Sequence, residues 1–255
     1  MMAWSMGIAA ASYLLYAAYL VSLGHQWHQV PRSKAMLMAV LLTATWGGLG
    51  SLFAQTGNVF YLLWSALVDA LRYGAWYVFL LLLLAPEGTT NYRKRPFGAW
   101  LIPLLWLVIV GGLVLHLGLG YRLLPTELLA RATLFQALSM AVLGLMLIEQ
   151  LLRNVSNDSL WNIKPLCLGL GSQFAFDLYL YSDALLFNQL DADAFAVRGF
   201  VQACVIPLLL VATTRSRDWT AKIRLSQKAA FHTATLLITG FYLLFVAGVG
   251  YYVRY

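Results

Sequence analysis

Residues 167–187 read CLGLGSQFAFDLYLYSDALLF, a stretch apolar enough to cross a bilayer although it carries Asp177 and Asp183. An ionised carboxylate in hydrocarbon is costly, so an acidic residue within such a run marks a candidate functional site. The role of the whole chain therefore depends on whether these acids bind something or only hold helices together.

The helical periodicity of this stretch separates its polar residues into two stripes. Each residue turns an α-helix by about 100°, so Gln173, Asp177 and Tyr181 fall on one face. Tyr179 and Asp183 fall on a second face. One helix can thus offer polar contacts to two neighbours.

The composition predicts an integral membrane protein. The chain has 255 residues, of which 61% are hydrophobic and 11% charged, whereas a soluble domain is about 25% charged. Its apolar runs are each near the ~20 residues that cross a bilayer core. We predict an all-α, polytopic bundle of about eight transmembrane helices, forming one domain over residues 1–255. The predicted spans are 4–23, 34–54, 59–85, 97–117, 128–152, 163–187, 194–213 and 229–252.

The distribution of positive charge predicts the orientation. Twelve of the 17 Lys and Arg residues fall in the connections after the first, third, fifth and seventh spans, and four fall on the opposite side. The positive-inside rule places the N-terminus outside, and eight spans return the C-terminus to the same side. The formal net charge of +7 therefore reflects topology and indicates no nucleic-acid partner. Arg198 is assigned to the outer rim, with Asp191 and Asp193.

A second pair of charges lies within the span at 59–85. Asp69 and Arg72 are three residues apart, so they face one another on one side of the helix, and pairing lowers the cost of burying each charge. Asp177 falls at roughly the same depth by helix rise. We predict that Asp177 joins Asp69 and Arg72 in one buried network. The candidate ligand site comprises Asp69, Arg72, Gln173, Asp177, Tyr179, Tyr181 and Asp183.

Other chemistry is not favoured by the sequence. His25 and His28 can share a helix face, but no further metal ligand lies near them, so we predict no metal site and no cofactor. Asp177 and Asp183 are roughly 9 Å apart in helix rise, too far to share a proton as catalytic carboxylates do. No catalytic residue is assigned. In the segment 214–228 Trp219 is interleaved with cations, a pattern typical of contact with anionic membrane lipid.

Several segments carry a family resemblance. They are the stretch 167–187, the LD and RGF that follow it, IEQLLRN at 148–154, and AFHTATLL and AGVGYYVRY near the C-terminus. Over about residues 145–255 they resemble the N-terminal membrane region of the histidine kinase family PrsK of the PEP-CTERM/exosortase system of Gram-negative bacteria.

The resemblance implies a sensor region in a two-component signal transduction system. In the family a further span, a GAF-like domain and a kinase core follow, and the kinase phosphorylates a response regulator. The resemblance also implies a homodimer. This chain has no phospho-acceptor His in an H-E-x-x-x-P context and no Gly-rich ATP lid. We therefore expect a non-catalytic module, either truncated or served by a kinase core encoded separately.

Three functions remain open at this stage. The first is a sensory input module whose polar residues form a cavity open to the periplasmic side, where ligand, lipid or protonation selects a helix arrangement. The second is a small membrane transporter, since intramembrane acids facing an Arg occur in proton-coupled carriers. The third is a purely structural anchor or scaffold, in which polar contacts only hold the helices together.

Overall fold

A computed structural model describes residues 1–23, 30–84, 96–120, 126–155 and 157–215, and these form seven helices and no strand. The predicted all-α class is therefore confirmed for this part of the chain. The helices are α1 (Met2–Ser22), α3 (Pro31–Thr56), α4 (Val59–Leu84), α5 (Pro96–Gly120), α6 (Thr126–Asn154), α7 (Asn157–Phe187) and α8 (Ala192–Arg215). The predicted eighth span, the basic residues 216–228 and the His25–His28 pair lie outside the described residues.

The described helices have the character of membrane spans. Five segments are long and apolar enough to cross a bilayer: Met2–Ser22, Pro31–Thr56, Val59–Leu84, Leu128–Asn154 and Ala192–Arg215. A shorter apolar segment, Trp106–Gly118, belongs to α5. α7, which contains the predicted span at 163–187, is not among the five. Length and composition thus indicate a membrane-embedded protein.

The helix ends follow from local residue chemistry. α3 begins at Pro31, whose missing N–H costs nothing in a first turn. It ends at Gly57, whose φ of +65° suits a residue without a side chain, and the Gly57 N–H donates to the Phe53 carbonyl over 2.8 Å. Asp191 accepts a 2.8 Å hydrogen bond from the Asp193 N–H and so caps the start of α8.

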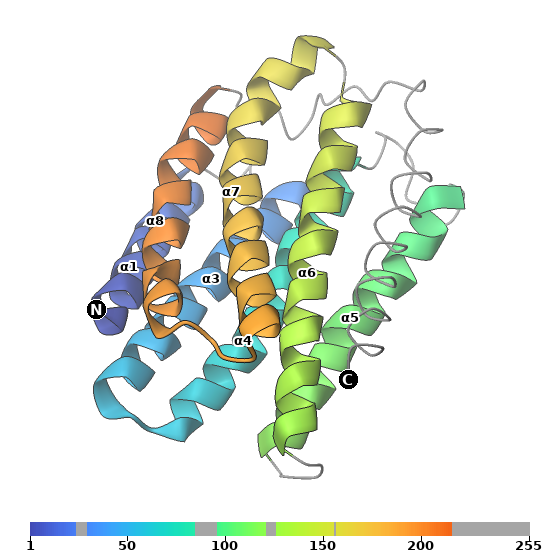
Figure 1. Ribbon diagram of the computed structural model, residues 1–255. Coiled ribbons are helices and arrows are strands. Elements are labelled where there is room, and N and C mark those ends of the chain that lie inside the picture. Colours follow the sequence, from blue (N-terminus) through green and yellow to red (C-terminus); the bar gives the residue numbers. More distant parts are fainter. Residues whose placement is uncertain (24–29, 85–95, 121–125, 156, 216–255) are drawn as a thin grey trace.

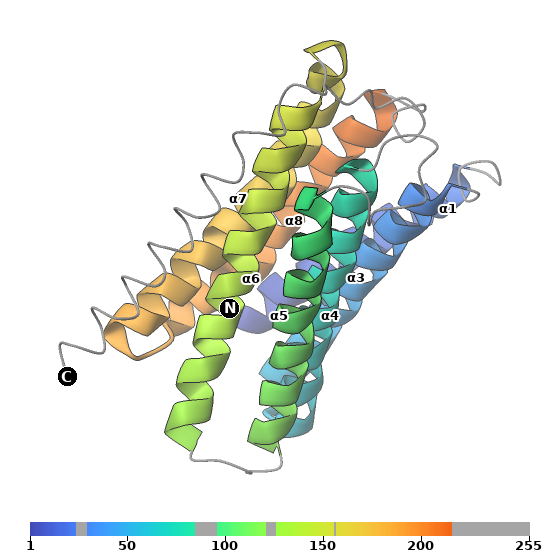
Figure 2. The ribbon, with the colours of Figure 1, turned by 90° about the vertical axis from the view of Figure 1, so that its right-hand side faces the viewer.

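Six of the helices form a closed ring. α1 packs against α3 and α8, α3 against α4, α4 against α6, α6 against α7, and α7 against α8 (Figure 1). α5 lies outside this ring and packs against α4 and α6 (Figure 2). Because α4 is separated from α7 and α8 along the ring, side chains that join these helices must cross its interior.

The two ends of the bundle differ. The N-terminal end holds the start of α1, the α3–α4 turn and the α7–α8 turn. The opposite end, called here the basic end, holds the start of α7 and the end of α8. Its described cations are buried Arg32 and, nearer solvent, Lys34, Arg153, Lys164 and Arg215.

Two glycines allow α1 to approach its neighbours closely. A Cβ built on Gly199 of α8 would lie 2.5 Å from the Ser5 backbone of α1. One built on Gly47 of α3 would lie 2.9 Å from the Met6 carbonyl oxygen. Small residues at helix contacts let backbones approach, as membrane bundles require. Arg198 precedes Gly199 in the chain, and this packing directs its side chain toward the interior of the ring.

Candidate functional site

The site begins with an ion pair within α4. The Arg72 Nη2 atom lies 2.6 Å from Asp69 Oδ1, and Arg72 Nε donates to the same oxygen over 2.9 Å. The two residues are three apart on the helix, the spacing that brings side chains together. Arg72 is fully buried, whereas 15% of the Asp69 side chain is exposed. The sequence-based prediction of this pair is confirmed.

α7 brings a second carboxylate to the pair. Asp177 is fully buried and lies 3.7 Å from Arg72 Nη2. The hydroxyl of Tyr73, the residue after Arg72, donates a hydrogen bond to Asp177 Oδ2. The Tyr73 ring stacks on Phe174, with 5.5 Å between ring centroids, which fixes the direction of that hydroxyl. The predicted union of Asp177 with Asp69 and Arg72 is therefore confirmed.

α8 contributes the residue that joins the two acids. Arg198 Nε lies 2.7 Å from Asp177 Oδ1 and Nη2 lies 3.1 Å from Oδ2, a bidentate pair. Its third nitrogen, Nη1, lies 2.9 Å from Asp69 Oδ2. The planar fork of a guanidinium suits this double recognition, which an ammonium cannot reproduce. One side chain of α8 thus binds both α4 and α7.

α3 closes the site with an indole. The guanidinium carbon atoms of Arg72 and Arg198 lie 4.5 and 4.8 Å from the centroid of the Trp46 ring. The centroid of the Tyr181 ring lies 5.5 Å from the guanidinium carbon of Arg198. Cations over aromatic faces are attracted by the ring quadrupole, more strongly where water is excluded. We call Trp46, Asp69, Arg72, Asp177 and Arg198 the charge network.

The charge network balances two acids with two cations in the interior of the ring. Desolvating a single unpaired ion costs several kcal/mol, so the pairing is what permits these residues in a membrane bundle. Helix rise places the network roughly 9–20 Å from the N-terminal end, counting from the starts of α4 and α8 and the end of α7. It therefore lies below that surface, within the apolar part of the helices.

Gln173 is buried near the network without a described partner. It lies one helical turn before Asp177 on the same stripe and is 1% exposed. Neither its amide nitrogen nor its amide oxygen has a hydrogen-bond partner among the described residues. Burying an amide without a hydrogen-bond partner costs free energy, so Gln173 calls for a functional explanation.

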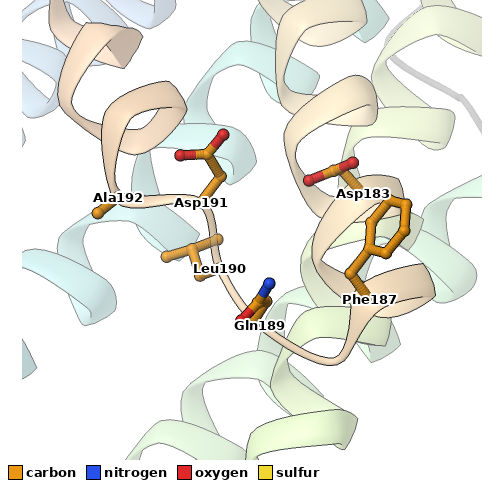
Figure 3. Close-up of a pocket in the computed structure, with 6 residues that line it drawn as sticks. All are labelled: Asp183, Phe187, Gln189, Leu190, Asp191 and Ala192. Atoms are coloured by element: carbon orange, nitrogen blue, oxygen red, sulfur yellow. The ribbon is translucent and has the colours of Figure 1, made fainter.

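The second stripe of α7 points elsewhere. Tyr179 is 56% exposed and so stands apart from the charge network. Asp183 lines a pocket of about 400 Å³ at the α7–α8 turn, with Phe187, Gln189, Leu190, Asp191 and Ala192 (Figure 3). The seven predicted residues thus divide into a buried group, one exposed ring and one pocket carboxylate. The expectation of one cavity containing all of them is corrected by this division.

The outer-rim assignment of Arg198 was wrong. The sequence places Arg198 seven residues after Asp191, in the first turns of a helix, where solvation is the usual outcome. In the structure Arg198 is buried at 1% exposure, because Gly199 seats α8 against α1 and turns the guanidinium inward. One signal could have located it: Gln202, four residues on, continues a buried polar stripe.

The network joins α4, α7 and α8 through ion pairs between their side chains. Among the described residues, no group of three or more His, Cys, Asp or Glu side chains could hold a metal ion. Each of the four charged side chains has an ion-pair partner on the same or another helix. These pairs hold α4, α7 and α8 in one arrangement.

Together the fold and the network define a membrane-embedded α-helical protein with a buried interhelical ion-pair site. No protein-family model, curated protein or solved structure matches the chain.

Proposed function

We propose that this protein is the sensory, non-catalytic input module of a two-component signalling system in a bacterial inner membrane. It would cross the membrane eight times with its N-terminus outside. The observation that carries the proposal is the double contact of Arg198, which binds Asp69 on α4 and Asp177 on α7. The charge network is then the element whose arrangement the stimulus changes.

The asymmetry of the network suits a switch. Arg198 holds Asp177 through two nitrogens and Asp69 through one, so losing the Asp69 contact leaves the α7–α8 pair intact. Asp69 is also the network carboxylate with exposed surface. Protonation of Asp69, or a cationic or hydrogen-bonding group beside it, would free α4 from α8. A ligand shifts such an equilibrium by its differential affinity for the two states.

The output side of the proposal rests on the resemblance to the PEP-CTERM histidine kinases. A kinase core, in the same chain or in a separate one, would read the position of α8 and of the segment that follows it. A response regulator would receive the phosphoryl group, and two copies of the module would pair in the membrane.

The test is a distance measurement between α4 and α8. Cys204 is exposed on α8 and accepts a spin label, whereas buried Cys167 is replaced by Ala. The second label goes on Leu71→Cys, beside Arg72 at a 43% exposed position. In lipid nanodiscs we expect Asp69→Asn to add a second population of label distances by double electron–electron resonance. Glu149→Gln, which removes a carboxylate from the exposed pair with Arg153, is the matched control and should leave the distribution unchanged.

The competing function is a structural anchor, which the complete pairing of the four charges favours. An anchor predicts that Asp69→Asn lowers the stability of the bundle while keeping a single distance population. It also predicts that no membrane extract or pH change shifts that population. Such a result would remove the switch and with it the sensory role.

A further inference from the structure

A second cluster of charge lies at the basic end, far from the charge network. The Trp161 indole, near the start of α7, is 62% exposed. The Lys164 Nζ atom lies 5.4 Å from its ring centroid, and the Arg215 guanidinium carbon lies 5.2 Å from it. Two helices, α7 and α8, thus present two cations around one exposed aromatic ring.

The cations of this cluster are not neutralised by the described side chains. No described carboxylate forms an ion pair with Lys164 or Arg215, whereas nearby Arg153 lies 2.7 Å from Glu149. Two like charges held near one ring repel each other, and an anion between them would relieve that repulsion. The cluster therefore has the charge of an anion site.

Apolar surface continues from the cluster along both helices. Leu168 follows Lys164 by one turn of α7 and is 64% exposed, and Val211 precedes Arg215 by one turn of α8 and is 37% exposed. α7 and α8 pack side by side along this length (Figure 1). A free phosphate ion would make no contact with this apolar surface, whereas the acyl chain of a lipid would cover it. Trp beside Lys or Arg is also typical of the membrane–water interface.

We propose that Trp161, Lys164 and Arg215 form a binding site for the phosphate headgroup of an anionic phospholipid, with its acyl chain along Leu168 and Val211. The two cations would bind the phosphodiester oxygens. The indole would lie at the level of the glycerol, where its amphipathic ring is stable. This site is independent of the charge network and of the sensory role.

The test compares lipid binding by the purified full chain with that of two charge-matched double variants. Lys164→Gln/Arg215→Gln removes the proposed site. Lys34→Gln/Arg153→Gln removes two cations from the same end of the bundle but leaves the cluster intact. The probes are phosphatidylglycerol and phosphatidylcholine, with bound lipids counted by native mass spectrometry. All variants are first checked for a monodisperse elution profile in detergent.

We expect the cluster variant to lose about thirtyfold in phosphatidylglycerol affinity, since each of the two cations near an anionic lipid surface contributes on the order of 1 kcal/mol. The control variant should stay within about twofold of the wild type, and phosphatidylcholine should bind weakly to all three. Leu168→Asn should weaken lipid binding without changing the affinity for glycerophosphoglycerol. Equal losses in both double variants, or competition by inorganic phosphate as strong as that by the lipid, would overturn the proposal.

Discussion

At the residue scale, Arg198 determines whether the buried charges are tolerated. Its guanidinium supplies three of the contacts that pair Asp69 and Asp177 across the helix ring. Replacing it leaves an acid of α7 in the interior with only Arg72, 3.7 Å away, and the Tyr73 hydroxyl. Breaking a buried pair by removing one partner is far more costly than the pair itself is stabilising.

We therefore predict that Arg198→Gln lowers the free energy of unfolding by about 3–5 kcal/mol, measured by denaturation with sodium dodecyl sulfate in mixed micelles. Arg198→Lys should recover only part of the loss, because an ammonium lacks the planar fork. Arg153→Gln, at an exposed pair, should cost about 0–0.5 kcal/mol. The double variant Arg198→Gln/Asp177→Asn should lose less stability than the sum of the losses in the two single variants. If the losses simply add, the two residues do not belong to one network.

Replacement of Gln173 should raise the stability of the bundle, whereas replacement of Arg198 should lower it. Its buried amide has no described partner, so Gln173→Met removes an unpaid desolvation cost and keeps the side-chain volume. We predict a gain of about 1 kcal/mol in the same unfolding measurement. The matched variant is Gln202→Met, since Gln202 accepts a 3.4 Å hydrogen bond from the Tyr13 hydroxyl and should lose stability instead. A loss at Gln173 as large as that at Gln202 would mean that its amide is satisfied.

Residue spacing alone could predict one part of this site. The Asp69–Arg72 pair follows from helix geometry, and the two stripes of α7 separate buried Gln173 from exposed Tyr179. The spacing of Arg198 to Gln202 indicates a polar face on α8. It does not identify the partners of Arg198 or of Trp46, because these contacts depend on which helices lie opposite each other. The order of the helices around the ring cannot be predicted from the spacing of residues within one helix.

At the scale of the helix, close packing of α1 against α8 decides where Arg198 points. We predict that Gly199→Ala destabilises the bundle by about 1–3 kcal/mol, because the new Cβ meets the Ser5 backbone at 2.5 Å. Gly48→Ala is the control, since a Cβ there meets nothing within 4 Å and Ala is the better helix former by about 0.5–1 kcal/mol. The measurement is again detergent denaturation. Equal effects at the two glycines would show that the contact is not tight.

The helices themselves could be predicted from apolar runs, but their ends could not. The predicted span at 163–187 corresponds to α7, which begins at Asn157 and so extends into polar sequence. Hydropathy reports the part of a helix that suits hydrocarbon, whereas hydrogen bonding continues until a residue such as Asn188, with φ of +54°, ends it. Helix length and apolar length are therefore separate quantities.

At the scale of the whole molecule, the two ends of the helix ring differ in charge. Consecutive helices alternate in direction, so every second connection meets at the same end. The described cations Arg32, Lys34, Arg153, Lys164 and Arg215 gather at the basic end, and the carboxylates of Asp183, Asp191 and Asp193 gather near the other. The positive-inside rule converts this separation into an orientation, which our proposal takes as N-terminus outside.

Accessibility of single cysteines tests that orientation directly. In a background with Cys167→Ala and Cys204→Ala, Gln189→Cys places a thiol in the exposed α7–α8 turn, and Lys34→Cys places one near the exposed start of α3. We predict that a membrane-impermeant maleimide labels Gln189→Cys in cells whose inner membrane is intact. Lys34→Cys should react only after lysis, because its end of the bundle faces the cytoplasm. The reverse pattern would place the N-terminus inside, and the anionic lipid bound by Trp161, Lys164 and Arg215 would then come from the outer leaflet.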